Sequence, residues 1–246
     1  MHNLVIAEER YQLVEWLYRI RKQYKRMGLF QPDFICIIFG KMMVSKLVRT
    51  DVDIRKAVDD WLFGNRTKAM EEYGPMNKWN TSLVTNMKRL FYEDADISKW
   101  DISGWDVSNV TDMSNMFYYN KSFNGDISGW DVSNVTNMSN MFMFASFDRD
   151  ISGWNVSSVT NMRCMFNQAC SFNGDISGWN VSSVTDMEGM LKGTIFNGDI
   201  SRWNVSNVTN MKEMFALNRV FNGDISQWDV SNVIDMSSMF MFTSFD

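Results

Sequence analysis

A tryptophan recurs at a nearly constant interval through most of the chain. From Trp79 to Trp228 the steps between tryptophans are 26, 25, 24, 25, 24 and 25 residues. A fixed period in this range indicates a repeat protein, in which each unit buries its apolar face only against its neighbours. We therefore expect seven stacked coils, which begin at Trp79, Trp105, Trp130, Trp154, Trp179, Trp203 and Trp228.

Apolar residues fall at fixed offsets from each tryptophan, which is counted as position 0. Valine at +5 and methionine at +8 are present in all seven copies, +11 is methionine except at Leu90, and +12 is phenylalanine except at Leu191. These offsets share one face of a helix, and serine at +3 or threonine at +6 suits its N-cap. The preceding segment D-I-S-G-W-D-V is short and rich in β-branched and aromatic residues, which favours a parallel strand. The sequence thus predicts an α/β solenoid with one short strand and one short helix per coil.

Residues 1–75 differ from the repeats and predict a helical region that caps a solenoid of residues 76–246. Apolar spacing predicts an amphipathic helix at 8–27 and a second helix at 33–49. The polar face of the first helix is basic, which fits a solvated face or contact with an acidic partner or a membrane surface. A third helix is expected to end at Gly64, with a short turn around Ala69 and Met70 after it. Its inward residues are Ile54, Ala57, Val58, Trp61 and Leu62, and the segment Y-G-P-M-N-K-W then covers the first coil.

Aspartate recurs at position −4 in six copies. The favoured interpretation is that each carboxylate accepts backbone N–H bonds in its own turn. A weaker alternative is a line of Ca²⁺ sites, since Ca²⁺ prefers carboxylate oxygens, although the usual calcium-loop spacing is missing. Asn or Asp at +1 predicts a second polar ladder in or beside a turn. The aspartates of the row are Asp101, Asp126, Asp150, Asp175, Asp199 and Asp224, and the calcium alternative concerns the last five.

Composition excludes several classes of protein. The formal net charge is −5, with the repeats acidic and the first 78 residues basic, which argues against a nucleic-acid-binding groove along the coils. Three cysteines are too few for a disulfide framework, and Cys164 and Cys170 are expected to be small buried thiols. No apolar run is long enough for a membrane helix, and no signal peptide is visible in M-H-N-L-V-I-A-E-E-R. We therefore expect a cytoplasmic or assembly-associated protein rather than a secreted one.

The frame W-[DN]-V-S-[NS]-V-T-[ND]-M-x-x-M-F, followed by F-N-G-D-I-S, resembles the BspA-like bacterial surface protein repeat family. That family is a divergent relative of leucine-rich repeats, and the resemblance covers about residues 76–246. It implies a leucine-rich-repeat-like, right-handed solenoid of about seven 24–26-residue coils. It also implies cell-surface attachment or protein binding, and no catalytic activity.

The sequence offers no catalytic constellation. Its single histidine, His2, leaves no His-dependent triad or His-rich metal site, no Gly-rich phosphate loop is present, and no cofactor is implied. Recognition then depends on positions that vary between copies, because packing occupies the others. Aromatic, methionine and arginine side chains are typical interface anchors. The candidate partner-binding residues are Tyr118, Tyr119, Lys121, Met143, Phe144, Gln168, Lys192, Leu217 and Arg219.

Three functional hypotheses follow. The first is a non-catalytic protein–protein interaction scaffold, of adhesion type if the family resemblance extends to function. The second is a structural subunit of a larger assembly such as a shell or capsid. It docks through an uncapped C-terminal coil, because the sequence stops at Asp246, before the next expected tryptophan, with no capping segment. A third and weaker hypothesis makes residues 8–62 an adaptor resembling the F-box arrangement, although the L-P start of that motif is absent.

Overall fold

The computed structural model describes Lys22, residues 46–93 and residues 96–245. The helices predicted at 8–27 and 33–49 therefore fall almost wholly outside the described residues. The predicted end of the 33–49 helix is wrong, because residues 48 and 49 belong to strand β1 (Val48–Thr50). A short parallel pair joins β1 to β2 (Asn80–Leu83), with Val48 opposite Asn80 and Thr50 opposite Leu83.

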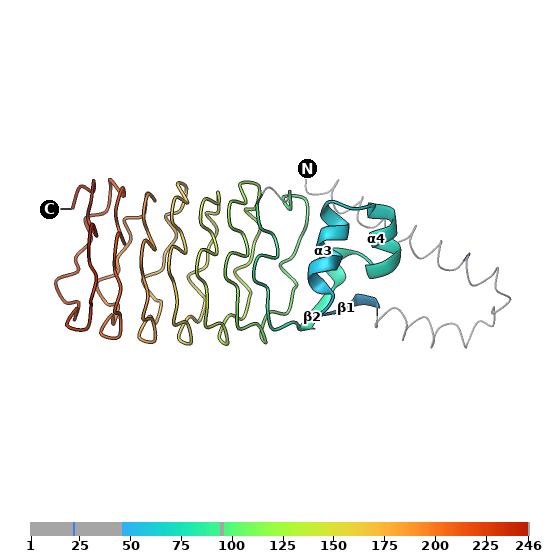
Figure 1. Cartoon of the computed structure of the whole chain (residues 1–246), viewed down its shortest axis with the longest axis horizontal. Helices are drawn as coiled ribbons and strands as arrows, with labels where there is room; N and C mark the ends of the chain where they lie inside the picture. The colour runs from blue at the N-terminus through green and yellow to red at the C-terminus, as the bar shows by residue number, and fades with distance from the viewer. Residues whose placement is uncertain (1–21, 23–45, 94–95, 246) are drawn as a thin grey trace.

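Two helices lie between these strands and cover one end of the repeats (Figure 1). Helix α3 (Ile54–Leu62) buries Ile54, Ala57, Val58 and Trp61, as its apolar spacing predicts. It ends two residues before Gly64. The predicted turn around Ala69 and Met70 is wrong, because both lie in helix α4 (Arg66–Tyr73). The N-cap of α4 is Asn65, whose side chain accepts a bond from the backbone N–H of Lys68 at 3.1 Å.

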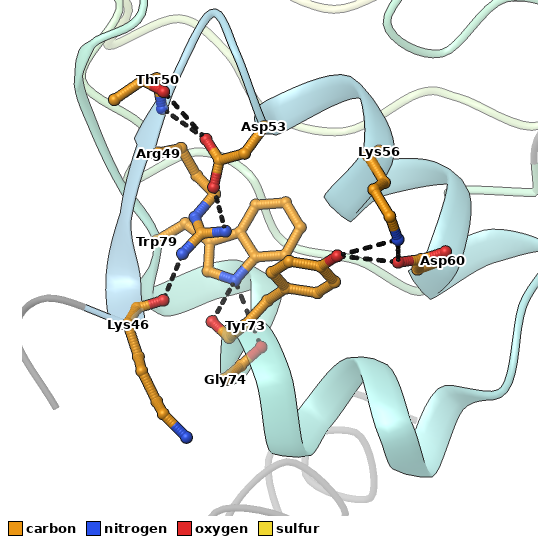
Figure 2. A network of polar contacts seen from close by, with 9 residues as sticks. All are labelled: Lys46, Arg49, Thr50, Asp53, Lys56, Asp60, Tyr73, Gly74 and Trp79. Atoms are coloured by element: carbon orange, nitrogen blue, oxygen red, sulfur yellow. Dashed lines mark hydrogen bonds and ion pairs between the residues drawn. The ribbon is translucent and has the colours of Figure 1, made fainter. Parts of the chain in front are cut away.

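A polar network joins β1 to the two helices (Figure 2). The buried Arg49 guanidinium donates to Asp53 at 2.6 Å and lies over the rings of Tyr73 and Trp79, 5.1 and 5.4 Å from their centroids. Burial lowers the pKa of Arg49, while the charge of Asp53 raises it. Tyr73 also donates its hydroxyl to Asp60 at 2.8 Å, and burial raises its pKa to about 12. The network fixes the segment that carries the first repeat tryptophan.

Successive repeat copies lie side by side as the coils of one stack (Figure 1). The residues at +5, +8, +11 and +12 are almost completely buried in the first six copies. The backbone differs from the predicted strand and helix, since over 84–93 and 96–245 it forms turns joined by single parallel bridges at position +7. A three-residue spacing of buried side chains therefore arises from turns, whose bonds between coils replace helical bonds. The handedness of the stack and its kinship with leucine-rich repeats stay predictions.

Hydrogen bonds between coils run in one direction along the stretch from +8 to +14. In the coil of Trp105, the N–H groups of Met113, Asn115, Phe117 and Tyr119 donate to carbonyls of the next coil at 2.8–2.9 Å. Positions +10 and +14 have a positive φ in every coil. Each is the third residue of a four-residue turn, closed by bonds such as Met116 N–H to the Met113 carbonyl at 3.1 Å, which is the type II arrangement.

Aromatic side chains fill the centre of the stack. Phe117 stacks between Phe91 and Phe142 at centroid distances of 5.6 and 5.5 Å, and on Phe123 of its own coil at 4.1 Å. Each repeat indole is buried and donates to a carbonyl before it in the chain, as Trp130 does to Ile102 at 3.2 Å. The core is continuous from α3 to the last coil. The division of the chain near residue 75 into two domains stays a prediction.

Candidate interaction surface on the coils

Most side chains of a coil are committed to the stack, either in the core or in turn hydrogen bonds. Positions +13 and +14 are the main exception, because they follow the buried phenylalanine at +12, differ between copies and mostly remain half-buried or exposed. Recognition that distinguishes one region of the stack from another therefore depends on them. In order they are Tyr92 and Glu93, Tyr118 and Tyr119, Met143 and Phe144, Asn167 and Gln168, Lys192 and Gly193, Ala216 and Leu217, and Met241 and Phe242.

The first three coils place four aromatic rings in contact at these positions. Tyr92 stacks on Tyr118 with ring centroids 4.9 Å apart, and Tyr118 meets Phe144 edge-on at 6.1 Å. Tyr119 lies 5.4 Å from Phe144 and 6.2 Å from Tyr118. Tyr119 is 38% exposed, and the other three are half-buried. We call Tyr92, Tyr118, Tyr119 and Phe144 the aromatic patch.

Two exposed cations border the aromatic patch. The guanidinium of Arg89 lies 5.0 Å from the ring centroid of Tyr92, and the ammonium of Lys121 lies 4.8 Å from that of Tyr119. Such contacts contribute about 0.5–1 kcal/mol at exposed sites. Neither cation has a salt bridge among the residues that the structure describes. One carboxylate lies at the edge: desolvation and a hydrogen bond with Glu93 raise the pKa of Tyr92 above its usual value.

The backbone at +14 does not account for the aromatic side chains there. Tyr119 and Phe144 have φ values of 58° and 60°, and Gly193 occupies the same position in a later coil with φ 66°. This left-handed region favours glycine, and for other residues it costs on the order of 1–3 kcal/mol. The frame thus accepts glycine at +14, and the large rings serve something other than the turn.

The middle coils carry charges that are paired with one another. Arg163 makes a two-pronged contact with Glu188, at 2.5 and 2.7 Å, across adjacent coils. Lys192 pairs with Glu213, and this ion pair lowers the pKa of the Glu213 carboxyl. The middle coils therefore pair their charges with one another, at +9 for Arg163 and Glu188, and between +13 and +10 for Lys192 and Glu213.

Family comparison places the repeats in a known group. A model described as "Mycoplasma protein of unknown function, DUF285" matches residues 60–147, 97–195 and 175–246, which together span well over half of the chain. The chain belongs to the DUF285 family. The first match begins inside α3, so the DUF285 model includes α4 as well as the coils. No curated protein and no solved structure matches the chain.

The DUF285 coils bring some of the predicted site residues together and keep others apart. Tyr118, Tyr119, Lys121 and Phe144 meet in or beside the aromatic patch. Met143 follows the same strip, and its carbonyl accepts from the Tyr119 N–H at 2.8 Å. The sequence-based list omitted Arg89 and Tyr92, although Tyr92 stands at +13 of the first copy, where counting from Trp79 finds it. The remaining candidates, Gln168, Lys192, Leu217 and Arg219, lie on the fourth to sixth coils.

The aspartates at −4 accept hydrogen bonds in their own turns, as predicted. In all six copies the backbone N–H two residues on donates to the carboxylate, at 2.9–3.0 Å. Backbone and hydroxyl bonds from the following serine lower the pKa of five of these carboxyls. Within the described ranges, no group of three or more His, Cys, Asp or Glu side chains is placed to hold a metal ion. The calcium alternative therefore gains no support from the coils. The five carboxyls whose pKa is lowered, which are also those of the calcium alternative, belong to Asp126, Asp150, Asp175, Asp199 and Asp224.

The cysteines differ from expectation. Cys164 is half-buried, which raises the pKa of its thiol, and Cys170 is exposed, so the prediction of two buried thiols is wrong. Cys36 lies outside the described residues. Among the helices of the described segments, none combines the length and the apolar character needed to cross a membrane.

The coil of Trp228 leaves one face uncovered. Its Val230 and Met236 are 37% and 43% exposed, whereas the valines at +2 and the methionines at +8 of the inner coils are buried. Phe242 at +14 is 69% exposed, and Ile234 is 87% exposed at +6, where the other copies carry an exposed threonine. Four of its backbone N–H groups, at +8, +10, +12 and +14, have no acceptor among the described residues, although their counterparts all donate to a following coil. The face is complementary to a row of carbonyls set beside an apolar surface.

Proposed function

We propose that this chain is a non-catalytic scaffold for protein–protein interaction, built from BspA-like repeats in a right-handed, leucine-rich-repeat-like solenoid. One observation carries the proposal. Seven coils share a buried frame, yet their side chains at +13 and +14 differ from copy to copy and in most copies are half-buried or exposed. A rigid stack with one variable strip is suited to binding extended surfaces. Tyrosine and phenylalanine are residues that interfaces use as anchors.

Affinity purification of the intact chain from its own cells tests this function. The comparison is with a variant that carries Tyr118→Ser, Tyr119→Gly, Phe144→Gly and Leu217→Gly, all on the variable strip. We expect a protein that is recovered with the unmodified chain and lost with the variant, while both keep the same circular dichroism spectrum. Recovery of the same proteins by both chains would count against the strip as the binding surface. A turnover of any co-purified small molecule would count against a non-catalytic role.

The open face of the Trp228 coil favours a second candidate, a structural role in an assembly. Exposed apolar side chains and four N–H groups without acceptors give this face a strong tendency to pair. Its occupant is either a further coil of the same frame or a neighbouring molecule. Light scattering of the purified chain separates the candidates, since concentration-dependent association that Phe242→Lys abolishes supports assembly. A monomer at all concentrations leaves the scaffold role alone.

A further inference from the structure

The aromatic patch is a bounded feature of the stack rather than a property of every coil. It occupies +13 and +14 of the first three coils, and the next coil has Asn167 and Gln168 at those positions. Gln168 lies so close over Gly193 that a Cβ there would meet its amide nitrogen at 2.4 Å, so the fourth and fifth coils are closed by polar packing. The patch therefore ends where the strip becomes polar.

The two cations at the patch have no ion partner among the residues that the structure describes. In the middle coils, Arg163 and Lys192 are each paired with a glutamate of the next coil. Arg89 and Lys121 have only aromatic rings beside them among the contacts of the described residues. Among the described residues, Glu93 beside Tyr92 is the carboxylate at the edge of the patch, so two cations face one anion there, on a chain whose net charge is −5. A negatively charged group gains most from docking at such a site.

We propose that the aromatic patch, together with Arg89 and Lys121, docks a polypeptide segment that places a carboxylate beside an aromatic or large aliphatic side chain. This inference rests on the proposed scaffold function and names the partner chemistry for one part of the strip. The carboxylate of the bound segment lies between Arg89 and Lys121. The apolar side chain of the segment packs on Tyr119 and Phe144. Tyr119 is the most exposed ring of the four, which makes it the central anchor.

Other partner classes fit the patch less well. A nucleic acid needs a long row of cations to neutralise its phosphates, and the surrounding repeats are acidic. A sugar packs flat on an open ring face. Here Tyr92 and Tyr118 cover one another, and cations lie over Tyr92 and Tyr119. A peptide can use ring edges and cations together, which is the mixture that this surface offers.

Selection from a displayed library of random peptides, on the immobilised full-length chain, tests the inference. The key variant is Tyr119→Gly with Phe144→Gly, which removes both rings and places glycine where φ is positive. The matched control is Leu217→Gly, because Leu217 has the same φ position in a coil far from the patch. A third variant, Lys121→Glu, reverses one charge without touching the core, and it serves alone should the double variant fail to fold.

We expect selected peptides to carry Asp or Glu next to an aromatic or large aliphatic residue. Their affinity should fall at least about tenfold on the double variant and on Lys121→Glu, and remain unchanged on Leu217→Gly. Added salt should weaken binding, since exposed charges are screened. Peptides that are neutral or basic, or that bind the double variant equally well, overturn the docking inference.

The same experiment separates this inference from the scaffold function. Peptides that bind elsewhere on the coils, and lose affinity on Leu217→Gly or on an Arg163→Ala variant, leave the scaffold function standing and reject the acidic partner. A library that yields no binder to any face of the folded chain rejects both proposals together.

Discussion

The first coil and the coil of Trp228 differ in how their outward-facing hydrogen-bonding groups are satisfied. Inside the stack, the carbonyl of Thr111 accepts from the N–H groups of Thr136 and Asn137 at 2.9 and 3.3 Å and from the Thr136 hydroxyl at 3.2 Å. At the first coil no earlier coil supplies that carbonyl. The Asp51 carboxylate takes its place, accepting from the N–H groups of Thr85 and Asn86 at 2.8 and 3.0 Å and from the Thr85 hydroxyl at 2.5 Å.

Two further contacts between the helical cap and the first coil follow the same pattern. Arg55 of α3 donates to the Lys88 carbonyl at 2.6 Å, where an inner coil would offer a backbone N–H. The indole of Trp79 donates to the carbonyls of Tyr73 and Gly74 at 2.9 and 3.2 Å, at the end of α4 (Figure 2). The cap thus imitates the hydrogen bonds of a missing coil. The coil of Trp228 has no such substitutes within the described residues, which shows that the frame itself does not close an end.

The largest expected effect compares one core position inside the stack and at its open end. Phe117 is fully buried between two neighbouring phenylalanines, whereas Phe240 stacks only on Phe215 and Phe245 and is half-buried. Phe117→Ala should lower the free energy of unfolding by about 3–5 kcal/mol, and Phe240→Ala by roughly half of that, since less apolar area is removed from water. Urea unfolding followed by tryptophan fluorescence measures both. Equal losses would mean that the last coil is covered in solution.

The next effect concerns the Asp51 carboxylate, which takes the place of a backbone carbonyl from a preceding coil. Asp51→Ala removes the acceptor of three hydrogen bonds and should lower the free energy of unfolding by about 1–3 kcal/mol. Asp51→Asn keeps a carbonyl oxygen for the backbone donors and should restore part of the loss. Hydrogen exchange of the Thr85 and Asn86 amides, which should quicken in the alanine variant, locates the effect. Unchanged exchange there would separate Asp51 from the capping role.

The sequence predicts the interior of this stack better than its backbone. The period and the apolar offsets identify the residues that are buried, such as Val110, Met113 and Phe117, because burial leaves a direct trace in composition. The offsets do not distinguish a helix from successive type II turns, since both return a side chain to one face after three residues. The hydrogen bonds that select turns over a helix join residues about 25 positions apart, in neighbouring coils, and the local sequence pattern does not reveal them.

The candidate surface follows the same rule. Exposed aromatic residues of the second and third coils stand out as departures from the frame, so Tyr118, Tyr119 and Phe144 are found from sequence. Tyr92 belongs to the loosest copy and is missed. The ring contacts and the unpaired state of Arg89 and Lys121 depend on how neighbouring coils align, which the sequence does not give. Asp51 is missed as a substitute acceptor because it lies 34 residues before its partner Thr85.

Lowering the pH should have a smaller effect on the stability of the fold. Hydrogen bonds from Thr85 and Asn86 outweigh desolvation and lower the pKa of Asp51, and serine bonds lower the pKa of the aspartates at −4. A carboxyl with a lowered folded pKa stabilises the fold fully above its unfolded pKa, about 3.9, and this contribution is lost as pH falls through the folded value. The urea midpoint should therefore hold from neutral pH to about pH 5 and fall below about pH 4. Asp51→Asn should show a shallower fall, and an equal fall would assign the acid response to the coils alone.

The smallest effect tests whether the last coil follows the frame. Position +6 is threonine in six copies and Ile234 in the seventh. In the second to sixth copies the threonine hydroxyl accompanies the backbone bond to the preceding coil. The backbone N–H of Ile234 already donates to the Thr209 carbonyl at 2.8 Å, so a threonine hydroxyl there would lie beside an existing acceptor. Ile234→Thr should therefore raise the free energy of unfolding by about 0.5–1 kcal/mol, with little apolar burial lost because Ile234 is 87% exposed. The reverse change in an inner coil, Thr185→Ile, should lower it by a similar amount. If Ile234→Thr instead destabilises the chain or prevents its association, Ile234 serves contact with a neighbour, and the open end is an interface rather than an unfinished frame.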